Sequence, residues 1–426
     1  MRQKLLHAWY KQLSYEIREI VWFAEKVKQS WLDICWENIW DPIAKGEKIP
    51  AWVKEIISEA LQNDKVFGYV HSKWLLSTRE YVASKNNLIT AEDIIFFNGL
   101  WEAINKIYGY LATSARVLGP NPAYSTHSSA EAANSWADHL TYTLDPNNDW
   151  NPDVEEIENK VKFNPNIAGI LVINPDNPTW AVFKRGVLEK IVDIARRYDL
   201  FLVFDEIYEK MVYNLEERVL LSDIIGDVPG ISMKGMSKEL PWPGGRCGWI
   251  EIYNQDKDEE FRKYMGSVLM SKMLEVCSTS LPQYVLPTIY EDERFMPYVR
   301  SRVEKYEKRA KMAEEILWDL DEIIFVKPGG AFYMSFVFRM DHMNENYKTE
   351  LSDAGLQKEL NTAIEGKRFD KRFCYWLLAS TGICTVPLSW FNSTYEWVRM
   401  TLLEDDEDKY RKILETVRGE ILCWKK

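Results

Sequence analysis

The sequence predicts an α/β fold built around a mostly parallel β-sheet. Residues 167–173 and 200–204 are continuously apolar, and residues 187–197 between them carry apolar side chains at helical spacing. Uninterrupted apolar strands that alternate with helices are typical of a parallel sheet covered on both faces. Polar residues follow both strands, beginning with Asn174 and Asp205. Because ligands bind at the carboxyl ends of such strands, we expect the chemistry at this edge.

The other elements are assigned in chain order from the same periodicities. Helices are predicted over residues 1–30, 50–63, 77–84, 100–112, 256–273, 298–317 and 406–422. Strands are predicted over 93–97, within 323–338 and over 397–403. The turn at Asn98-Gly99, between a strand and a helix, favours an anion site, because free backbone N–H groups and the helix dipole converge there. An ordinary strand-to-helix turn explains the same residues.

Composition excludes several classes of protein. The 426 residues are 46% hydrophobic, which is enough for a large core and two domains. A net charge of -12 without a basic cluster argues against a nucleic-acid partner. No membrane-spanning run and no signal peptide are recognised, so we expect a cytoplasmic protein. The six cysteines form no CxxC pair and the five histidines show no ligand spacing, which indicates reduced thiols and no metal.

One lysine carries the functional prediction. Lys238 precedes Arg246 by eight positions, with glycines and prolines between them. A lysine amine held neutral forms a Schiff base with an aldehyde, and the planar fork of arginine binds a phosphate. An aldehyde and a phosphate on one small molecule describe pyridoxal 5'-phosphate (PLP). Taken alone, the pair also fits two solvated surface charges.

Three further residues point to the same cofactor. Asp205, at a strand end, suits pairing with a protonated pyridine nitrogen, and Tyr208 suits hydrogen bonding to a ring hydroxyl. Asn177 lies between two prolines, where a rigid backbone aims its amide. Each also has an ordinary interpretation, namely an aspartate that caps the next turn and an asparagine in a proline-rich turn.

Together these residues resemble the class I and II aminotransferases, a family of fold-type I PLP enzymes. The matching segments are Asn174-Pro175-Asp176-Asn177-Pro178-Thr179 for NPxNPTG, Asp205-Glu206-Ile207-Tyr208 for D-E-x-Y, Ser237-Lys238 through Arg246 for SK…R, and Arg399 for the C-terminal carboxylate-binding arginine. The motifs stand in family order from about residue 36 onward. The resemblance implies a large PLP-binding domain at 50–325 and a smaller α+β domain made from 1–49 and 326–426.

The resemblance also implies roles around the cofactor. Lys238 would hold PLP as a Schiff base and later move the substrate proton, and Asp205 would keep the ring nitrogen protonated. Asn177 and Tyr208 would hydrogen-bond the ring hydroxyl. The remaining cofactor contacts would come from Tyr124 against the ring and from Arg246, Ser237, Leu100 and Trp101 at the phosphate. Gly235 stands where the family often has a serine that contacts the phosphate.

Substrate and partner residues follow in the same way. Arg399 would bind the substrate carboxylate, with Asn177 and Trp40 beside it. Tyr69 would reach the phosphate of a neighbouring subunit, which implies a homodimer with shared active sites. The implied function is ping-pong transfer of an amino group between an L-amino acid and a 2-oxo acid. Two alternatives stay open: another PLP reaction at Cα, by a lyase or racemase, and a non-catalytic protein whose pocket is blocked by tryptophans. The donor and acceptor are not specified.

Tryptophan is unusually frequent in the chain. There are 18 Trp and 20 Gly, whereas average usage gives roughly 30 Gly at this length. Trp40, Trp74 and Trp180 stand where the family has glycine, and further cases are Trp101, Trp136, Trp318, Trp390 and Trp397. We hypothesise that UGA codons meant as glycine have been translated as tryptophan. Genuine tryptophans packed in a divergent pocket are the alternative.

Overall fold

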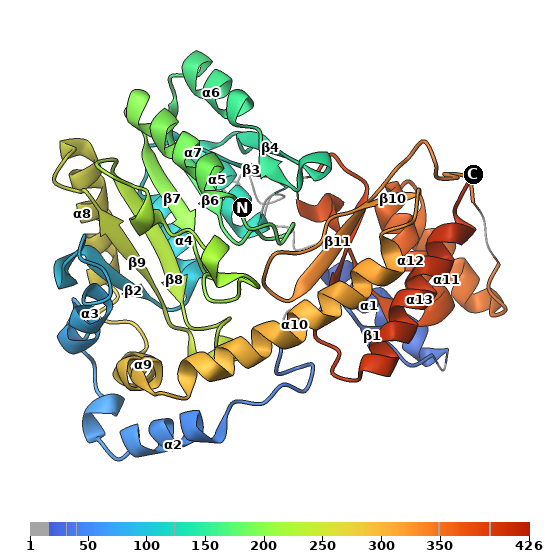
Figure 1. The fold of residues 1–426 in the computed structure, drawn as a ribbon, viewed down its shortest axis with the longest axis horizontal. Helices are drawn as coiled ribbons and strands as arrows, with labels where there is room; N and C mark the ends of the chain where they lie inside the picture. The colour runs from blue at the N-terminus through green and yellow to red at the C-terminus, as the bar shows by residue number, and fades with distance from the viewer. Residues whose placement is uncertain (1–16, 31, 40, 123, 348–349, 392) are drawn as a thin grey trace, which may run out of the picture.

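The computed structural model describes residues 17–30, 32–39, 41–122, 124–347, 350–391 and 393–426 (Figure 1). Its largest element is an eight-stranded sheet in the order β2-β9-β8-β7-β6-β3-β4-β5. The strands are β2 (Ile94–Phe97), β3 (Arg116–Asn121), β4 (Thr141–Asp145), β5 (Asn151–Pro152), β6 (Ile167–Ile173), β7 (Phe201–Asp205), β8 (Gly230–Gly235) and β9 (Gly248–Tyr253). Strands β8, β7, β6, β3 and β4 are parallel to their neighbours in that run. The predicted α/β class with a mostly parallel sheet is confirmed.

The register of the central strands places the polar residues at one edge. Ile173 pairs with Asp205, and Asp205 pairs in turn with Met233 on the other side. Just beyond the pairing, the Asn174 N–H donates to the Asp205 carbonyl at 3.0 Å. Parallel strands bring their carboxyl ends together, so the connections after β6, β7 and β8 all leave from the same edge of the sheet.

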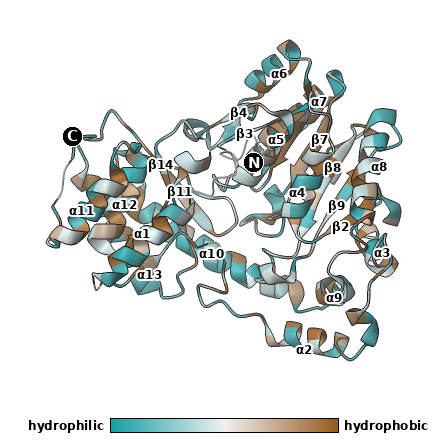
Figure 2. Ribbon diagram, turned by 180° about the vertical axis from the view of Figure 1, so that it is seen from behind, coloured by the Kyte–Doolittle hydropathy of each residue, from teal (hydrophilic) through white to brown (hydrophobic). Residues whose placement is uncertain are grey.

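Helices cover both faces of this sheet with their apolar sides inward (Figure 2). They are α4 (Leu100–Gly109), α5 (Ser125–Ser135), α6 (Val154–Phe163), α7 (Arg185–Arg197) and α8 (Glu259–Met273). In α7, for example, Leu188 and Ile191 are buried while Arg196 and Arg197 stand in the last turn. Helices α2 (Ala51–Ala60), α3 (Leu76–Ala83) and α9 (Ser280–Glu291) pack beyond β2 and β9.

A second, antiparallel sheet of four strands lies in the C-terminal part of the chain. Its order is β10 (Ile323–Phe325), β11 (Tyr333–Phe338), β14 (Trp397–Thr401) and β13 (Val386–Pro387). Helices α11 (Ala354–Ile364), α12 (Phe369–Thr381) and α13 (Glu407–Cys423) pack beside it (Figure 1). The N-terminal helix α1 (Ile17–Gln29) joins them, and β1 (Cys35–Trp36) pairs in parallel with β12 (Ile383–Cys384). We propose from this arrangement that 1–49 and 326–426 form one domain and 50–325 the other.

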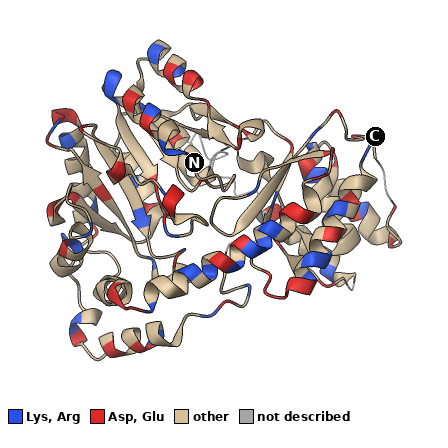
Figure 3. Cartoon of the chain, in the orientation of Figure 1, with Lys and Arg blue, Asp and Glu red and all other residues tan. Residues whose placement is uncertain are grey.

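Helix α10 (Phe295–Leu317) connects the two parts of the molecule. It runs from α9, beside the large sheet, to the C-terminal helices and carries charges along its length (Figures 1 and 3). Its inner side nevertheless buries two arginines, Arg302 and Arg309. The charged residues of α10 are therefore not all exposed, and the helix predicted over 298–317 has a buried side as well.

Several helices begin or end where capping residues place them. Asp258 accepts from the Phe261 N–H at 2.7 Å, and Asp406 accepts from the Lys409 N–H at 3.0 Å. Helices α8 and α13 therefore begin one residue after an aspartate N-cap, which is inside the predicted ranges. The first predicted helix is described only from Ile17, and its residues 1–16 lie outside the described part of the chain.

Three helices carried no clear periodic signal. Helix α5 is rich in serine, α9 contains Pro287 in its interior, and α12 is buried on nearly every side. Serine favours caps and turns, and proline usually ends a helix. The intrinsic helix propensity of these residues therefore opposed the observed helices. Packing against the rest of the fold outweighed that preference. Over the described residues, no helix combines the length and the apolar character that a membrane crossing requires.

Candidate active site

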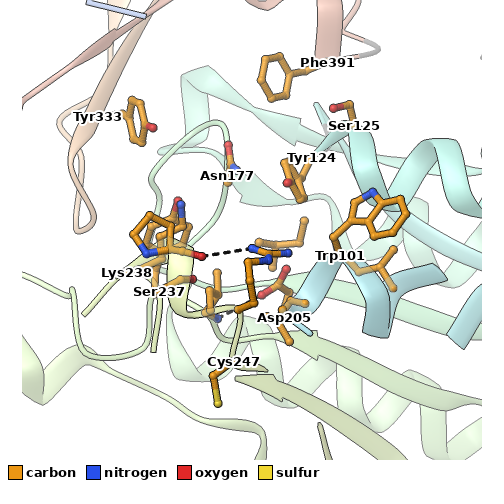
Figure 4. A pocket seen from close by; sticks show the side chains of 18 of the residues that line it. Trp101, Tyr124, Ser125, Asn177, Asp205, Ser237, Lys238, Cys247, Tyr333 and Phe391 are labelled. Carbon is orange, nitrogen blue, oxygen red and sulfur yellow. Dashed lines mark hydrogen bonds between the residues drawn. The ribbon is translucent and has the colours of Figure 1, made fainter. Parts of the chain in front are cut away.

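A cavity of about 230 Å³ opens at the carboxyl ends of β6, β7 and β8. Asn177, from the connection after β6, Asp205, at the end of β7, and Lys238, from the connection after β8, line it (Figure 4). Tyr208 lines it as well. The other predicted residues in its wall are Leu100, Trp101, Tyr124, Ser237, Arg246 and Arg399. Segments that are far apart in the sequence thus converge on one space.

The amine of Lys238 is adapted to act as a nucleophile. Burial, together with the positive charge of Arg399, lowers the pKa of Lys238 to about 8. Asp41 and Asp205 act in the opposite direction but do not cancel the shift. The Nζ atom lies 5.6 Å from the centre of the Tyr208 ring. The fraction of neutral amine near neutral pH is therefore far greater than for an ordinary lysine, as a Schiff-base lysine requires.

Asp205 is held by a buried hydrogen-bonding chain that sequence reasoning missed. Its Oδ2 lies 3.2 Å from His127 Nε2, and His127 Nδ1 lies 3.3 Å from the Tyr108 hydroxyl. The Ile207 N–H donates to the other carboxylate oxygen at 3.1 Å. His127 stands within a run of serine and threonine in α5, and no motif singles it out. The only signal for His127 in the sequence was its position shortly after Tyr124, which is the N-cap of α5.

Arg246 lies against the turn at Asn98-Gly99, beside the N-terminus of α4. Gly99, with φ +83°, makes this possible, because a Cβ there would lie 2.5 Å from Arg246 Nη2. The guanidinium donates from Nη2 to the Asn98 carbonyl at 3.0 Å. The first N–H groups of a helix have no partner inside it, so those of Leu100 and Trp101, in the first turn of α4, suit an anion beside Arg246.

Gly235 has a structural explanation that does not involve the phosphate. A Cβ at this position would lie 2.9 Å from the Cys247 carbonyl oxygen and 3.1 Å from Ile207 Cδ1. The neighbouring strand and the turn after β7 therefore leave no room for a serine side chain. Ser125, which the sequence did not single out, lines the cavity instead and offers a hydroxyl.

Arg399 is a buried cation whose partner is missing. It lies on β14, and its Nε and Nη2 atoms have no hydrogen-bond acceptor within the described residues. Its guanidinium carbon lies 4.6 Å from the Tyr333 ring centre and 5.3 Å from that of Phe391. Buried charges are normally paired. This end of the cavity therefore fits an anionic group such as a carboxylate, and the unpartnered Asn177 Oδ1 offers an acceptor nearby.

Comparison with known proteins agrees with this geometry. A family model described as aminotransferase class I and II matches residues 42–417. The chain belongs to this family. The sequence-based prediction of an aminotransferase, an enzyme of the transferase class, is confirmed.

The relatives include one that spans nearly the whole chain. An uncharacterised aminotransferase of Methanocaldococcus jannaschii is 50% identical over 426 residues, 99% of both chains. Glutamate-pyruvate aminotransferase AlaA of Escherichia coli K12 is 29% identical over 333 residues, covering 76% of this chain and 80% of its own. The solved alanine aminotransferase of Pyrococcus furiosus aligns with a TM-score of 0.84 at 22% identity, over 98% of this chain and 99% of its own. That structure shows the shared fold.

One predicted residue of this aminotransferase, Tyr69, is not among the residues that line the described cavity. It is 86% exposed. Trp40 lies outside the described residues. The roles given to all these side chains stay predictions, including the contact of Tyr69 with a second subunit.

The tryptophans suspected of replacing glycine fall into two groups. Trp74, Trp136 and Trp180 have φ of 66°, 57° and 65°, and Trp150, which the sequence did not flag, has 59°. This left-handed region favours glycine, because other residues meet a steric penalty there. Trp101 and Trp318, in contrast, lie in or at the end of helices, and Trp390 and Trp397 have no positive φ. The first group fits the glycine hypothesis, and the second needs no glycine.

The indole at position 180 does not block the pocket. Trp180 is buried behind Tyr333, with ring centres 4.4 Å apart, and it is absent from the cavity wall. Its indole N–H has no acceptor among the described residues, as is also true of Trp74 and Trp150. Trp180 therefore does not occupy the described cavity. The alternative of a non-catalytic protein whose pocket is blocked by Trp180 is not supported.

One group of possible metal ligands lies outside the cavity. Cys35, Glu37 and Glu404 place ligand atoms within 4.8 Å of one another. The Glu37 carboxylate is already paired with Lys45 at 2.9 Å and accepts from Thr401. Burial raises the pKa of the Cys35 thiol to about 12, so the thiolate that a metal needs is disfavoured. This group is better explained as an internal contact between β1 and the C-terminal sheet.

Proposed function

We propose that this aminotransferase holds PLP through Lys238 and transfers an amino group from an L-amino acid to a 2-oxo acid in a ping-pong cycle. The observation that carries the proposal is a single cavity with three matched features. These are an amine of lowered pKa, an anion-binding helix end beside Arg246, and an unpaired buried Arg399. They suit an aldehyde, a phosphate and a carboxylate respectively.

The described residues suffice to hold this cofactor. Lys238 would bind its aldehyde carbon, Arg246 with Ser237 and the α4 N-terminus its phosphate, and Tyr124 one face of its ring. Asp205 would bind the ring nitrogen, and Asn177 and Tyr208 the ring hydroxyl. When bound, PLP supplies an electron sink that stabilises negative charge at the substrate Cα.

The chain itself supplies binding and proton transfer. Arg399 would hold the substrate carboxylate and so fix the orientation of the Cα–H bond. The Lys238 Nζ, once released by the substrate amine, would take the proton from Cα and deliver it to the former aldehyde carbon, because its pKa of about 8 lies near the working pH. The His127 contact would hold the Asp205 carboxylate in the orientation that the ring nitrogen needs, and the apolar walls would limit water.

The cavity wall favours amino acids with small or apolar side chains. Its described cations are Lys238, Arg246 and Arg399, and each is assigned to another group. Tyr124, Tyr333 and Phe391 surround the remaining space. We propose alanine as the first donor to test, which agrees with the names of AlaA and of the alanine aminotransferase relatives.

A donor and acceptor panel tests the function directly. The PLP-loaded protein is mixed with alanine, glutamate, aspartate or an aromatic donor, and with pyruvate or 2-oxoglutarate. We expect transamination, and we expect Lys238→Ala to lower turnover by at least about 10³-fold and to remove the visible absorbance of the lysine–cofactor Schiff base. Normal turnover without Lys238 refutes the proposal, as does a wild-type protein that binds PLP but forms no 2-oxo acid with any pair.

We also propose a homodimer with shared sites. Three segments lie together beside the α4 N-terminus, because Ser280 Oγ donates to the Val66 carbonyl at 2.6 Å and the Thr279 N–H to Asn98 Oδ1 at 2.8 Å. Exposed large apolar side chains cluster on them, namely Phe67, Tyr69, Trp101, Leu274 and Val276. Such a patch favours a protein partner. Sedimentation at the 50.1 kDa chain mass rather than twice that value would contradict the dimer.

A further inference from the structure

The backbone at Lys238 accepts hydrogen bonds from an arginine that does not line the cavity. Arg302, on α10, donates from Nη1 to the carbonyl oxygens of Lys238 and Glu239 at 2.7 and 2.8 Å. Its Nε and Nη2 donate to the two carboxylate oxygens of Glu47 at 2.5 and 3.0 Å. One buried guanidinium is thus fixed at both ends, and it holds two consecutive carbonyls next to the proposed Schiff-base lysine.

The side chain of Glu239 is held as firmly as its carbonyl. Its carboxylate accepts from the Tyr290 hydroxyl and lies 3.0 Å from Lys210 Nζ. Lys210 also pairs with Glu209, and Glu209 lies 3.4 Å from Lys234. The cations Lys210 and Lys234 keep the pKa of Glu209 at about 2 although burial by itself would raise it.

The acidic residues of this ion-pair network directly follow three site residues in the sequence. Glu239 follows Lys238, Glu209 follows Tyr208, and Glu206, which lies 3.8 Å from Lys234, follows Asp205. The connection after β7 and the connection after β8 are therefore joined behind the cavity. The joint uses charge-assisted contacts, which are stronger and shorter than neutral hydrogen bonds.

We propose that Arg302 and Lys210 are positioning residues that fix the Lys238–Glu239 peptide against the turn carrying Asp205 and Tyr208. This inference rests on the proposed function of Lys238. A lysine side chain has four rotatable bonds, so the amine returns to the same place after each release only if its backbone stays in place. A displacement of 1 Å in a catalytic group lowers turnover by about 10²-fold. The clamp limits that displacement without touching the substrate.

Helix α10 also supplies a matched control. Arg309 is, like Arg302, 3% exposed, and it lies two turns further along the same helix. It donates to the Leu402 carbonyl at 2.7 Å and to Asp405 at 2.9 Å. Neither of those residues lines the cavity. Loss of Arg309 therefore reports the effect of removing a buried arginine from α10 without disturbing Lys238.

The test compares Arg302→Met with Arg309→Met in the PLP-loaded full-length enzyme. For Arg302→Met we expect kcat to fall about 10- to 100-fold per folded molecule, with little change in KM because Arg399 is intact. The absorbance maximum or the titration of the lysine–cofactor Schiff base should shift as well. Arg309→Met should lower the melting temperature but leave kcat and the absorbance at wild-type values.

A second pair of variants keeps the test decisive when Arg302→Met does not fold. Lys210→Met should reduce kcat in the same direction, and Lys210→Arg should restore most of it, because arginine keeps the charge beside Glu239. The proposal is overturned if Arg302→Met matches Arg309→Met in kcat and absorbance, or if Lys210→Met turns over at the wild-type rate. Both results leave the proposed function standing when Lys238→Ala is inactive. An active Lys238→Ala refutes that function itself.

Discussion

Two lysines four residues apart have opposite electrostatic environments. Lys234, on β8, has its Nζ 3.4 Å from both Glu209 and Glu251 and 3.8 Å from Glu206. Burial alone would lower the pKa of Lys234, but these three carboxylates raise it well above its usual value. Lys238 faces the cavity, where burial and Arg399 lower its pKa to about 8.

The contrast shows that burial does not by itself make a reactive lysine. Both amines are removed from bulk water, but Lys234 lies beside three carboxylates, whereas at Lys238 burial and the arginines outweigh Asp41 and Asp205. Lys234 serves as a permanent cation that neutralises an acidic interior, whereas Lys238 is left without a close carboxylate and stays available as a nucleophile. A lysine's function in this stretch is therefore set by its partners.

The largest expected effect is a difference in the free energy of unfolding between variants of the two lysines. Lys234→Met should lower the free energy of unfolding by about 3–5 kcal/mol, because it leaves buried carboxylates without their cation. Lys238→Met removes an amine that has no such partner, so the stability of the cofactor-free protein should be unchanged or slightly higher. Urea denaturation of both variants at neutral pH measures the difference. Equal losses would show that the two environments are alike.

The pH dependence of the same variants sharpens the contrast. The pKa of Lys238 is lowered from 10.5 to about 8, so the folded chain binds fewer protons there than the unfolded chain between these values. The stability of the wild type relative to Lys238→Met should therefore rise from about pH 8 to 10.5. The pKa of Lys234 is raised, so its contribution is complete below 10.5 and is lost only at higher pH.

The rate at which PLP binds to the cofactor-free protein also depends on the pKa of Lys238. The rate at which the cofactor-free protein combines with PLP should increase with pH around a midpoint near 8, because only the neutral amine attacks. Stopped-flow absorbance from pH 6 to 10 records it, with Lys234→Met as a control that keeps Lys238. A midpoint at the ordinary lysine value would contradict the lowered pKa.

The smallest expected effect is a difference in the free energy of unfolding between glycine variants of two exposed tryptophans with different backbone conformations. Trp136 is 58% exposed with φ 57°, and Trp318 is 70% exposed with φ -66°. Trp136→Gly should raise the free energy of unfolding by about 1 kcal/mol, because it relieves a left-handed conformation at a helix end. Trp318→Gly should instead lower it by up to about 1 kcal/mol. Thermal denaturation compares them, and equal shifts would remove the backbone argument.

The gene itself settles the glycine hypothesis. UGA codons at positions 74, 136, 150 and 180, where the backbone is left-handed, would support translation as glycine in the original host. UGG codons at 40, 74 and 180 would end the hypothesis. The structure sharpened this prediction because it added Trp150 and left Trp318 without a need for glycine.

Strand β6 and the lysine motif could be predicted because their signals are local. The observed β6 is Ile167–Ile173, as the apolar run indicated, and Lys238 and Asp205 lie at strand ends on one edge of the sheet. His127 and Arg302 could not be found in the same way. His127 meets Asp205 across 78 positions, and Arg302 meets Glu47 across 255. No periodicity or motif encodes contacts at such separations.

The sequence by itself determined which chemical groups are present, where β2, β6 and β7 of the central sheet lie, and which family the chain resembles. Those properties depend on side-chain type and on spacing along a few turns or strands. Only the tertiary structure decided that Lys238 has a lowered pKa and Lys234 a raised one. Electrostatic energy depends on distances in space, and the carboxylates and guanidinium that set these two values come from segments brought together by folding.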